Sequence, residues 1–283
     1  MMKIIDFRVR VPYGSFLKAG FYSDIPKREK VADGKYNMTL PQSVYQGSME
    51  LLLKEMDELN IVKAIVPARK AFHVDNSELV SLLQEYPNRF IAFAAVDPLD
   101  GEVALNEIMQ YVVNGPCTGV VMEPGYSYER ERIAIDDDRG MPIYELCEKE
   151  NIPMMLGFGG MLHPSLEKMR PVSVDNIALQ FPNLRMVLAH GGWPFVQEMT
   201  WIALMRKNIY LMPDLYMYKT PFTWDYVAGA NTVIKEKIIF GSAYPIVSQK
   251  ESVHNYLNIG IQSEFLENVM YKNALRFLQM EDI

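Results

Sequence analysis

The sequence predicts an α/β fold: a (β/α)8 TIM barrel formed by a single domain, with a long loop after the first strand. Eight short apolar runs alternate with helical patterns along the 283 residues. Most of these runs are nearly continuous in apolar residues, which is typical of parallel strands covered on both faces. Eight such units in this length suit a (β/α)8 barrel. A doubly wound open sheet is the alternative, but no Gly-rich phosphate-binding turn follows the first run.

The apolar runs are read as strands and the periodic segments between them as helices. The strands are expected at residues 4–12, 61–67, 90–96, 119–122, 152–160, 184–192, 208–212 and 237–245. The helices are expected at residues 49–59, 76–85, 103–113, 141–150, 174–181, 194–205, 226–233, 254–258 and 264–280. Residues 13–48 read as an irregular segment, and loops of this length are usually lids, binding loops or contact arms. No linker divides the chain, so residues 1–283 are expected to form one domain.

The composition limits which partners and which cellular compartment are expected for the protein. The formal net charge of −7 argues against nucleic acid or an anionic membrane as the main partner, which leaves small molecules or other proteins. Cys117 and Cys147 lie in unrelated contexts, so reduced thiols and a cytoplasmic location are expected. The sequence shows no signal-peptide pattern and no apolar run long enough to span a bilayer.

The first apolar run carries charges where a buried strand normally excludes them. Apolar residues alternate there with Asp6, Arg8 and Arg10, so the three charged side chains share one face. A buried charge without a partner is very costly, so these arginines must face water, a carboxylate or a ligand. The face is therefore either a candidate site or the solvated side of an edge strand.

Polar residues recur where the other expected strands end, and the active sites of such barrels are built there. In chain order these positions hold Arg8, Arg10, Arg69, Asp97, Glu123, Gly157, His190, Asp214, Ser242 and Tyr244. Several have a structural alternative, since Asp97 precedes Pro98 and Asp214 follows Pro213 at expected turns. His190 precedes Gly191 and Gly192, which allow the backbone to approach a ligand closely. Their convergence predicts a site at this end of the barrel.

Several motifs together resemble the amidohydrolase superfamily. They are residues 5–10 (IDFRVR), 152–159 (IPMMLGFG), 188–194 (LAHGGWP), 239–245 (IFGSAYP) and 273–278 (NALRFL). The most similar part of the superfamily is the amidohydrolase-related branch of barrel hydrolases and decarboxylases, which includes aminocarboxymuconate-semialdehyde decarboxylase. The resemblance spans nearly the whole chain, and it implies the barrel fold and chemistry on small molecules.

The resemblance also implies a divalent metal site, which this sequence does not reproduce. In the family, a His-x-His pair on the first strand, a His after the fifth, commonly one after the sixth and an Asp after the eighth hold the metal. The matching positions are Arg8, Arg10, Gly157, His190 and Ala243. A catalytic zinc site needs about three protein ligands, and neither a guanidinium nor a Gly or Ala side chain donates a lone pair. No metal and no other cofactor is therefore expected.

Two of the lost ligands are replaced by arginines, which suggests a site for a small anionic ligand. Guanidinium groups bind carboxylates in a planar two-pronged contact, and Arg69 and Lys35 would add positive charge. In this hypothesis His190 and Glu123 are the catalytic proton-transfer groups. The substrate is bound by Arg8, Arg10, Arg69, His163 and Tyr244. The alternative is internal neutralisation, in which Arg8 or Arg10 pairs with Glu123, Asp97 or Asp214 and forms a structural plug.

Three function classes follow. The first is a metal-independent hydrolase or decarboxylase-like lyase that acts on a small carboxylated substrate. The second is a catalytically inactive homologue that binds an organic anion. The third is a structural or regulatory partner of an active homologue. Members of this branch often form dimers, so the resemblance also implies a possible homodimer.

Overall fold

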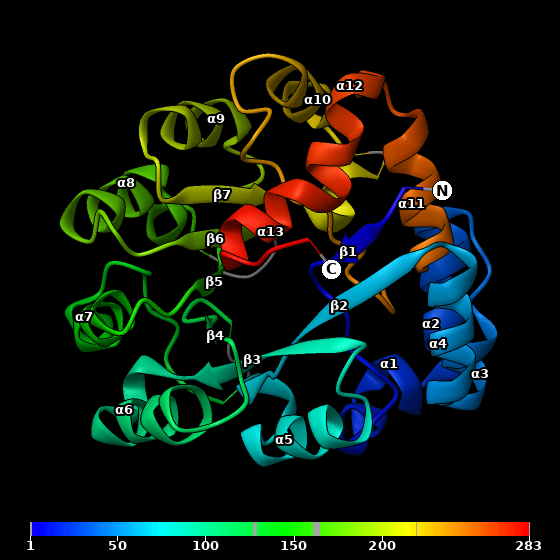
Figure 1. Cartoon of the computed structure of the whole chain (residues 1–283), viewed down its shortest axis with the longest axis horizontal. Helices are drawn as coiled ribbons and strands as arrows, with labels where there is room; N and C mark the ends of the chain where they lie inside the picture. The colour runs from blue at the N-terminus through cyan, green and yellow to red at the C-terminus, as the bar shows by residue number, and fades with distance from the viewer. Residues whose placement is uncertain (1, 127–128, 161–164, 219, 283) are drawn as a thin grey trace.

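The computed structural model describes residues 2–126, 129–160, 165–218 and 220–282, and it confirms the barrel class. Seven described strands pair in parallel and in chain order, with helices arranged around them (Figure 1). They are β1 (Ile4–Asp6), β2 (Ile61–Pro67), β3 (Phe90–Val96), β4 (Gly119–Met122), β5 (Met154–Gly157), β6 (Met186–Ala189) and β7 (Ile209–Met212). Each named strand lies within the range that the sequence predicts, although β1 is much shorter than expected.

The expected eighth strand is not regular, and this part of the prediction is corrected. Between β7 and β1 the chain forms only two isolated parallel bridges, Leu211 with Ile238 and Val9 with Tyr244. Backbone hydrogen bonds nevertheless join it to both sides, from Ile239 N to Leu211 O (2.9 Å) and from Phe7 N to Phe240 O (3.0 Å). Residues 237–245 therefore close the ring of strands without forming a regular strand.

Helices cover the outside of the sheet, mostly where the sequence places them. They are α4 (Met49–Glu58), α5 (Asn76–Glu85), α6 (Glu102–Ile108), α7 (Met141–Lys149), α8 (Pro171–Gln180), α9 (Val196–Met205), α10 (Thr223–Asn231), α11 (Gln249–Asn258), α12 (Ser263–Glu267) and α13 (Asn273–Leu278). Caps define some of the starts, since Ser48 accepts a hydrogen bond from Leu51 N and Asp75 accepts one from Ser77 N. None of the described helices is both apolar enough and long enough to cross a membrane.

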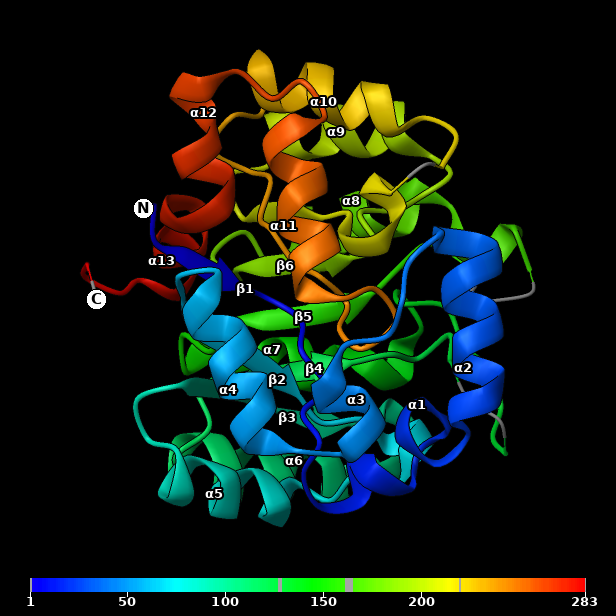
Figure 2. The same ribbon diagram turned by 90° about the vertical axis from the view of Figure 1, so that its right-hand side faces the viewer.

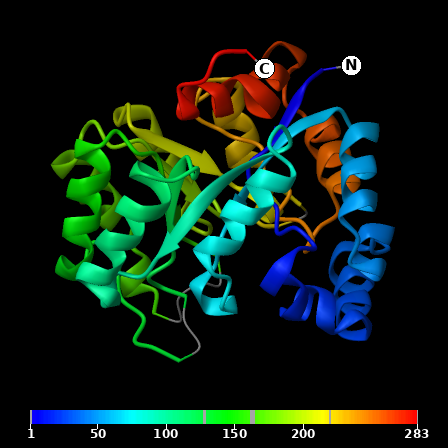
Figure 3. The ribbon, with the colours of Figure 1, turned by 60° about the horizontal axis from the view of Figure 1, so that its bottom comes forward.

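The segment between β1 and α4 is helical, whereas the sequence predicts an irregular segment there. It contains a 3-10 turn (Gly14–Lys18), α1 (Gly20–Ser23), α2 (Ile25–Val31), a π turn (Ala32–Tyr36) and α3 (Gln42–Gln46). Figures 2 and 3 place α1 and α2 at one end of the barrel, and α13 and both chain ends at the opposite end. We call residues 13–48 the lid segment, because α1 and α2 lie at the end where the strands finish.

Aromatic side chains fill the end of the barrel nearest α13. Phe7 packs edge-on against Phe93 and Phe277, with ring centroids 6.0 and 5.4 Å apart, and Phe277 also contacts Tyr210. Phe7, Phe93 and Phe277 are fully buried. Cys117 and Cys147 are buried as free cysteines. Because apolar groups fill this end of the barrel, the polar side chains of the strand ends lie at the opposite end.

Asp6 joins β1 to the irregular closing segment. Its carboxylate accepts hydrogen bonds from Ser242 N (2.8 Å), Ser242 Oγ (2.6 Å) and Gln249 Nε2 (2.9 Å), and a longer one from Arg8 N (3.3 Å). The side chain is fully buried, and burial raises its pKa despite these donors. Ladder hydrogen bonds are sparse here, so Asp6 fixes the segment that a regular strand would otherwise hold.

We expect Asp6→Ala to lower the free energy of unfolding by about 2–4 kcal/mol, because several buried donors lose their acceptor. Urea unfolding followed by circular dichroism measures the change. Asp33→Ala is the matched control, since Asp33 is exposed on the π turn, and its effect should stay within about 0.5 kcal/mol. Equal stabilities of the two variants would contradict the role given to Asp6.

Candidate active site

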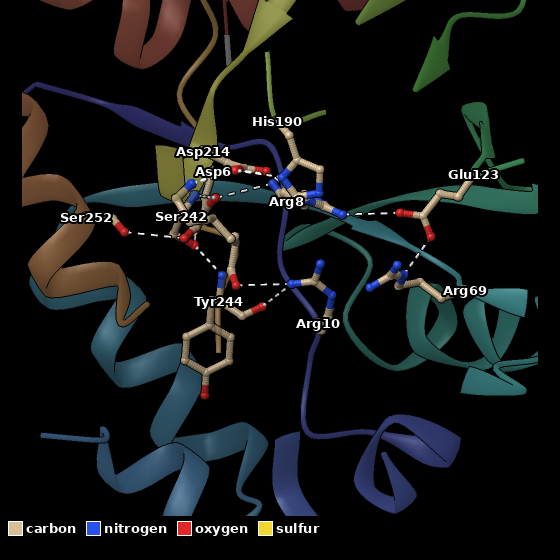
Figure 4. A network of polar contacts seen from close by, with 12 residues as sticks. Asp6, Arg8, Arg10, Arg69, Glu123, His190, Asp214, Ser242, Tyr244 and Ser252 are labelled. Carbon is tan, nitrogen blue, oxygen red and sulfur yellow. Dashed lines mark hydrogen bonds and ion pairs between the residues drawn. The ribbon is translucent and has the colours of Figure 1, made fainter. Parts of the chain in front are cut away.

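Arg8 lies at the centre of a buried cluster formed by the ends of four strands (Figure 4). Its Nη1 donates to Asp214 Oδ2 (2.7 Å) after β7, and its Nη2 donates to Glu123 Oε1 (3.2 Å) after β4. The same Nη1 lies 3.0 Å from Nε2 of His190, which follows β6. The Arg8 side chain is 1% exposed, so these partners replace water around its charge. The charge of Arg8 is thus neutralised within the protein, which is the alternative that the sequence left open.

His190 and Asp214 form a hydrogen-bonded pair next to Arg8. His190 Nδ1 lies 3.1 Å from Asp214 Oδ1, and a proton on Nδ1 lets the ring donate to this carboxylate. Nε2 is then the acceptor for Arg8. The second carboxylate oxygen of Asp214 is already taken by Arg8. This arrangement orients the imidazole and leaves it uncharged.

Burial and neighbouring charges set the protonation of this pair. Burial lowers the pKa of His190 below its usual 6.5, and Arg8 lowers it further, although Asp214 acts in the opposite direction. Burial acts to raise the pKa of Asp214, but His190 and Arg8 outweigh it, so this pKa lies below its ordinary value. At neutral pH the pair is therefore a neutral imidazole and a carboxylate.

Glu123 links Arg8 to a second arginine, Arg69. Arg69 Nε donates to Glu123 Oε2 at 2.7 Å, while Oε1 accepts from Arg8. Burial acts to raise the pKa of Glu123, but Arg69 and Arg8 lower it below its ordinary value. The Arg69 guanidinium lies against the rings of Phe72 and Tyr126, 4.6 and 4.7 Å from their centroids. Its buried Nη2 has no hydrogen-bond partner among the described residues.

Arg10 differs from Arg8 because no described carboxylate lies within ion-pair distance of it. Its Nη1 donates to the carbonyl oxygens of Ala243 (3.1 Å) and Tyr244 (3.5 Å), and its guanidinium stands 5.2 Å from the ring of Phe21. Its Nε is buried without a described partner, and the residue is 1% exposed. Burial, Arg8 and Arg69 lower the pKa of Arg10 and outweigh Glu123 and Asp214, which act to raise it.

A cavity of about 440 Å³ opens beside these arginines, between the strand ends and the lid segment. Its floor includes Arg8, Arg10, Arg69 and His190, and its aromatic lining is Phe21, Phe72, Tyr126 and Tyr216. Charged residues of the lid segment complete it, namely Asp24, Lys27, Arg28 and Lys35. A volume of this size accommodates a small organic molecule. Cationic groups dominate the lining, so the cavity favours an anionic one.

Not every residue of the predicted site reaches this cavity. The ring of Tyr244 points away from His190 and Arg8, and its hydroxyl lies 2.7 Å from Ser43 Oγ, so only its carbonyl contacts Arg10 (Figure 4). Asp97 pairs with Arg130 at 2.8 Å instead of Arg8 or Arg10. His163 lies outside the described residues. A ligand-binding role for His163 and Tyr244 therefore stays a prediction.

Sequence reasoning left some site residues out. Asp214 was named as a strand-end residue and as a possible partner of Arg8, although the preceding proline also favoured a turn. Most of the aromatic lining lies in loops and lid helices, where no sequence period signals a shared cavity. The residues missed are Phe21, Phe72, Tyr126 and Tyr216. Trp193 stacks on one of them, Tyr216, with ring centroids 4.9 Å apart.

Three non-glycine residues at the site adopt left-handed backbone conformations. The φ angles are +70° at His190, +46° at Asp214 and +57° at Ala243. Such conformations cost of order 1–2 kcal/mol each and are retained where the surroundings fix them, which is common at functional sites. The glycines after His190 pack against protein, since a Cβ on Gly192 would lie 2.3 Å from Met199 Cγ. The contact with Met199 is therefore enough to require glycine at position 192, without the expected approach of a ligand to this backbone.

The positions implied to hold a metal carry a different set of groups. Arg8 places a fixed positive charge next to His190, Asp214 and Glu123, the neighbouring residues whose side chains have donor atoms for a cation. Gly157 and Ala243 bring no ligating side chain. Within the described ranges, no group of three or more His, Cys, Asp and Glu residues is arranged to hold a metal ion.

The fold and the site together define a class of protein: a parallel α/β barrel whose charged side chains gather where its strands end. The sequence matches the family model described as amidohydrolase over residues 29–280, and the chain belongs to this family. The family resemblance of the motifs is thereby confirmed. A search of curated protein sequences finds no significant match.

Solved structures agree with this class. An uncharacterised TIM-barrel protein from Bordetella bronchiseptica is 30% identical, with a TM-score of 0.91, and the match covers 98% of this chain and 99% of that one. 2,6-Dihydroxybenzoate decarboxylase from Rhizobium is 16% identical, with a TM-score of 0.72 and 99% of each chain covered. 5-Carboxyvanillate decarboxylase from Sphingomonas paucimobilis is 14% identical, with a TM-score of 0.67, and 99% of this chain and 100% of that one are covered. The last two likenesses show a shared fold.

The two central arginines should respond oppositely to removal of their charge. We expect Arg8→Met to cost about 3–5 kcal/mol of unfolding free energy, because Asp214 and Glu123 lose a buried counter-charge. Arg10→Met should be no less stable than the parent protein, because it removes a buried cation that no described carboxylate balances. The carbonyls of Ala243 and Tyr244 keep backbone donors, Ile246 N and Arg10 N, each at 3.0 Å. Urea unfolding without added organic acids compares the variants, and equal losses would contradict the assignment.

The His190 ring should remain neutral at a pH where an ordinary histidine is half protonated. Because its pKa is lowered from 6.5, its share of folding stability is present above that pH and is lost on further acidification. Nitrogen-detected NMR of the imidazole rings at pH 6.5 should show His190 uncharged with the proton on Nδ1. The signal that disappears in His190→Gln identifies it. A titration midpoint at or above 6.5 would argue against the buried pair.

Proposed function

We propose that the protein is a metal-independent enzyme, a decarboxylase-like lyase or a hydrolase, that acts on a small carboxylated substrate. The observation that carries the proposal is the buried Arg10 guanidinium, which lines the cavity and has no described carboxylate partner. It lies next to the His190–Asp214 pair in a cavity of about 440 Å³. Such a charge is costly unless an anion accompanies it for part of the working cycle. Membership of the amidohydrolase family supports small-molecule chemistry at this place.

The donors available support binding of a carboxylate. Arg10 and Arg69 both line the cavity, and each has a buried nitrogen without a described partner, so we propose that a ligand carboxylate accepts hydrogen bonds from these two guanidinium groups. Charge-assisted hydrogen bonds of this kind contribute about 1.5–3 kcal/mol each. Phe72 and Tyr126 keep the Arg69 guanidinium in a fixed plane, so little side-chain entropy is lost on binding. The structurally similar decarboxylases, whose names specify carboxylated aromatic acids, are consistent with this ligand class.

The groups at the family's metal positions do not fit a divalent metal. Arg8 brings a permanent positive charge within 2.7 Å of Asp214 and 3.0 Å of His190, so a second cation there meets repulsion. The guanidinium itself can supply part of what a metal supplies, which is positive charge next to a developing oxyanion. No step proposed here passes through a metal.

His190 is the proposed proton-transfer group. It is neutral, lines the cavity and is oriented by Asp214, which also stabilises the imidazolium that forms when the ring accepts a proton. In this structure Arg8 donates to its Nε2. A ligand carboxylate that attracts Arg8 would release this nitrogen. Substrate binding and exposure of the base would then be coupled.

Glu123 was expected to be a second proton-transfer group, and its surroundings favour a positioning role. Two arginines lower its pKa, so it remains a carboxylate at neutral pH and is a weak base and a poor acid. Its two oxygens hold Arg8 and Arg69 at fixed positions. We therefore propose that Glu123 orients both arginines.

A second candidate function is an anion-binding protein without turnover. It is favoured by the contacts around His190. Arg8 donates to Nε2, Asp214 contacts Nδ1, and Arg8 is itself held by Asp214, so both ring nitrogens of His190 are already hydrogen-bonded. The same Arg10 and Arg69 donors would bind the ligand. A role as partner of an active homologue stays a prediction, as does a homodimer.

Turnover of a panel of carboxylated aromatic and unsaturated acids tests the proposal. Mass spectrometry and carbon dioxide release should detect product formation by protein treated with EDTA. His190→Gln should lower kcat by about 10²–10⁴-fold, since a positioned proton-transfer group contributes that much. Arg10→Met should raise KM by about tenfold or more, since it removes a charge-assisted hydrogen bond.

His254→Gln is the matched control, because His254 is an exposed histidine on α11 and should leave both constants unchanged. Activity that appears only after addition of zinc or manganese would overturn the metal-independent reading. Acids that raise the melting temperature through Arg10 without any turnover would favour the second candidate. If no acid is turned over or bound, both candidates fail.

A further inference from the structure

We propose that Tyr22 is a positioning residue of the candidate site: its hydroxyl fixes helix α1 to the main chain at Arg10 and so holds Phe21 against the Arg10 guanidinium. This inference rests on the proposed function and adds the lid segment to the parts of the chain that build the anion site. Three features of the structure support it: the contacts of α1 with Arg10, a second attachment of the lid segment close by, and an aromatic pair that links Arg10 to Arg69.

Two consecutive residues of α1 contact Arg10 at two different places. The ring centroid of Phe21 lies 5.2 Å from the Arg10 guanidinium, and the Tyr22 hydroxyl donates to the Arg10 carbonyl oxygen at 2.5 Å. Tyr22 and Arg10 are both buried. Burial raises the pKa of Tyr22 well above its ordinary value, so the hydroxyl keeps its proton and remains a donor. Helix α1 therefore holds Arg10 by its main chain and by its charged group together.

The position of Phe21 depends on this hydroxyl because α1 is very short. It has four residues, and the amides of Tyr22 and Ser23 both donate to the Ala19 carbonyl, at 3.0 and 3.1 Å. A single helical turn has too few internal hydrogen bonds to fix its own orientation, so contacts with the rest of the chain must do so. The hydrogen bond from Tyr22 is such a contact, and it lies next to the residue whose ring meets the guanidinium.

The lid segment has a second attachment to the main chain near Arg10. Arg28, on α2, donates through Nη2 to the carbonyl oxygens of residues 245–246, both at 3.1 Å. These residues directly follow residues 243–244, whose carbonyl oxygens accept from Arg10 Nη1. Tyr22 and Arg28 thus attach α1 and α2 to the same stretches of chain that hold Arg10. The surroundings of the Arg10 guanidinium are complete when the lid segment lies in this position.

An aromatic pair extends the effect of α1 to the second arginine of the proposed anion site. Phe21 and Phe72 meet edge to face with ring centroids 5.0 Å apart, and Phe72 lies 4.6 Å from the Arg69 guanidinium. Both rings and both arginines line the cavity. A carboxylate that accepts from two guanidinium groups requires a defined orientation of one relative to the other. We therefore expect a displaced α1 to weaken anion binding, even though the Tyr22 hydroxyl itself contacts only protein groups among the described residues.

Benzoate binding, measured by isothermal titration calorimetry at low ionic strength, tests the inference. Tyr22→Phe keeps the ring and removes the hydroxyl, and it should weaken benzoate binding about three- to tenfold, the factor expected for one neutral hydrogen bond. Phe21→Leu should weaken it by a similar factor. Because Tyr22 is proposed to act through Phe21, adding Tyr22→Phe to Phe21→Leu should change the affinity by less than about twofold.

Tyr45→Phe is the matched control. The Tyr45 hydroxyl also belongs to the lid segment, but it donates to Glu29 at 2.6 Å on the exposed side of that segment. Its removal should leave the affinity for benzoate unchanged.

The NMR signal of the Arg10 Nε–H group provides a second measurement that requires no ligand. This nitrogen is buried, and its signal is identified by its loss in Arg10→Met. The ring current of Phe21 acts on the nearby guanidinium, so Phe21→Leu and Tyr22→Phe should both shift the signal. Tyr45→Phe should not. A hydroxyl that only stabilised the fold would leave the signal in place.

A Tyr22→Phe protein with a lower melting temperature, but with the parent's benzoate affinity and Arg10 signal, would overturn the inference and leave the proposed function intact. Independent effects of Tyr22→Phe and Phe21→Leu would also overturn it, because the hydroxyl would then not act through the ring. If Tyr22→Phe does not fold, Phe21→Leu decides: an unchanged affinity and an unchanged Arg10 signal would contradict the inference. If the parent protein does not bind benzoate at all, the proposed function fails together with the inference.

Discussion

The electrostatic balance of one buried guanidinium, that of Arg8, governs the arrangement of the whole site. At 1% exposure its charge is stable only with close acceptors, and two carboxylates and an imidazole supply them. Each acceptor comes from a different strand end, so these contacts also fix β4, β6 and β7 relative to β1. Glu123 extends the network to Arg69 after β2. A single charge requirement thus couples five elements of the barrel.

Arg10 shows the opposite condition only two residues further along the chain. It is as deeply buried as Arg8, yet in the described chain its guanidinium contacts carbonyl oxygens and an aromatic ring. A fold selected only for stability has little reason to keep such a group. The contrast separates two kinds of buried charge: Arg8 is satisfied by the protein, whereas Arg10 and Arg69, which line the cavity, each keep a buried nitrogen without a described partner.

The parts of the fold that follow from local periodicity were predictable. The apolar runs located β2 to β7 and the strand ends, and thereby Arg69, Glu123 and His190. The helices of the lid segment were missed because they are short and interrupted by Gly and Pro, so their apolar period is weak. Asp214 was weighed as a turn residue because of Pro213. Only the assembled barrel shows that its left-handed backbone points the carboxylate at Arg8 and His190.

The irregular closing segment belongs to the site as much as the strand ends do. In a regular strand at residues 237–245, the carbonyl oxygens would accept hydrogen bonds from the neighbouring strands. Here Asp6 holds Ser242, the backbone turns at Ala243, and the carbonyls of Ala243 and Tyr244 face Arg10. The resemblance implies a metal-binding Asp at position 243, but the main chain at this position contacts a guanidinium instead. The closing segment thus supplies Arg10 with carbonyl acceptors, while the Tyr244 carbonyl also accepts a backbone hydrogen bond from Arg10 N at 3.0 Å.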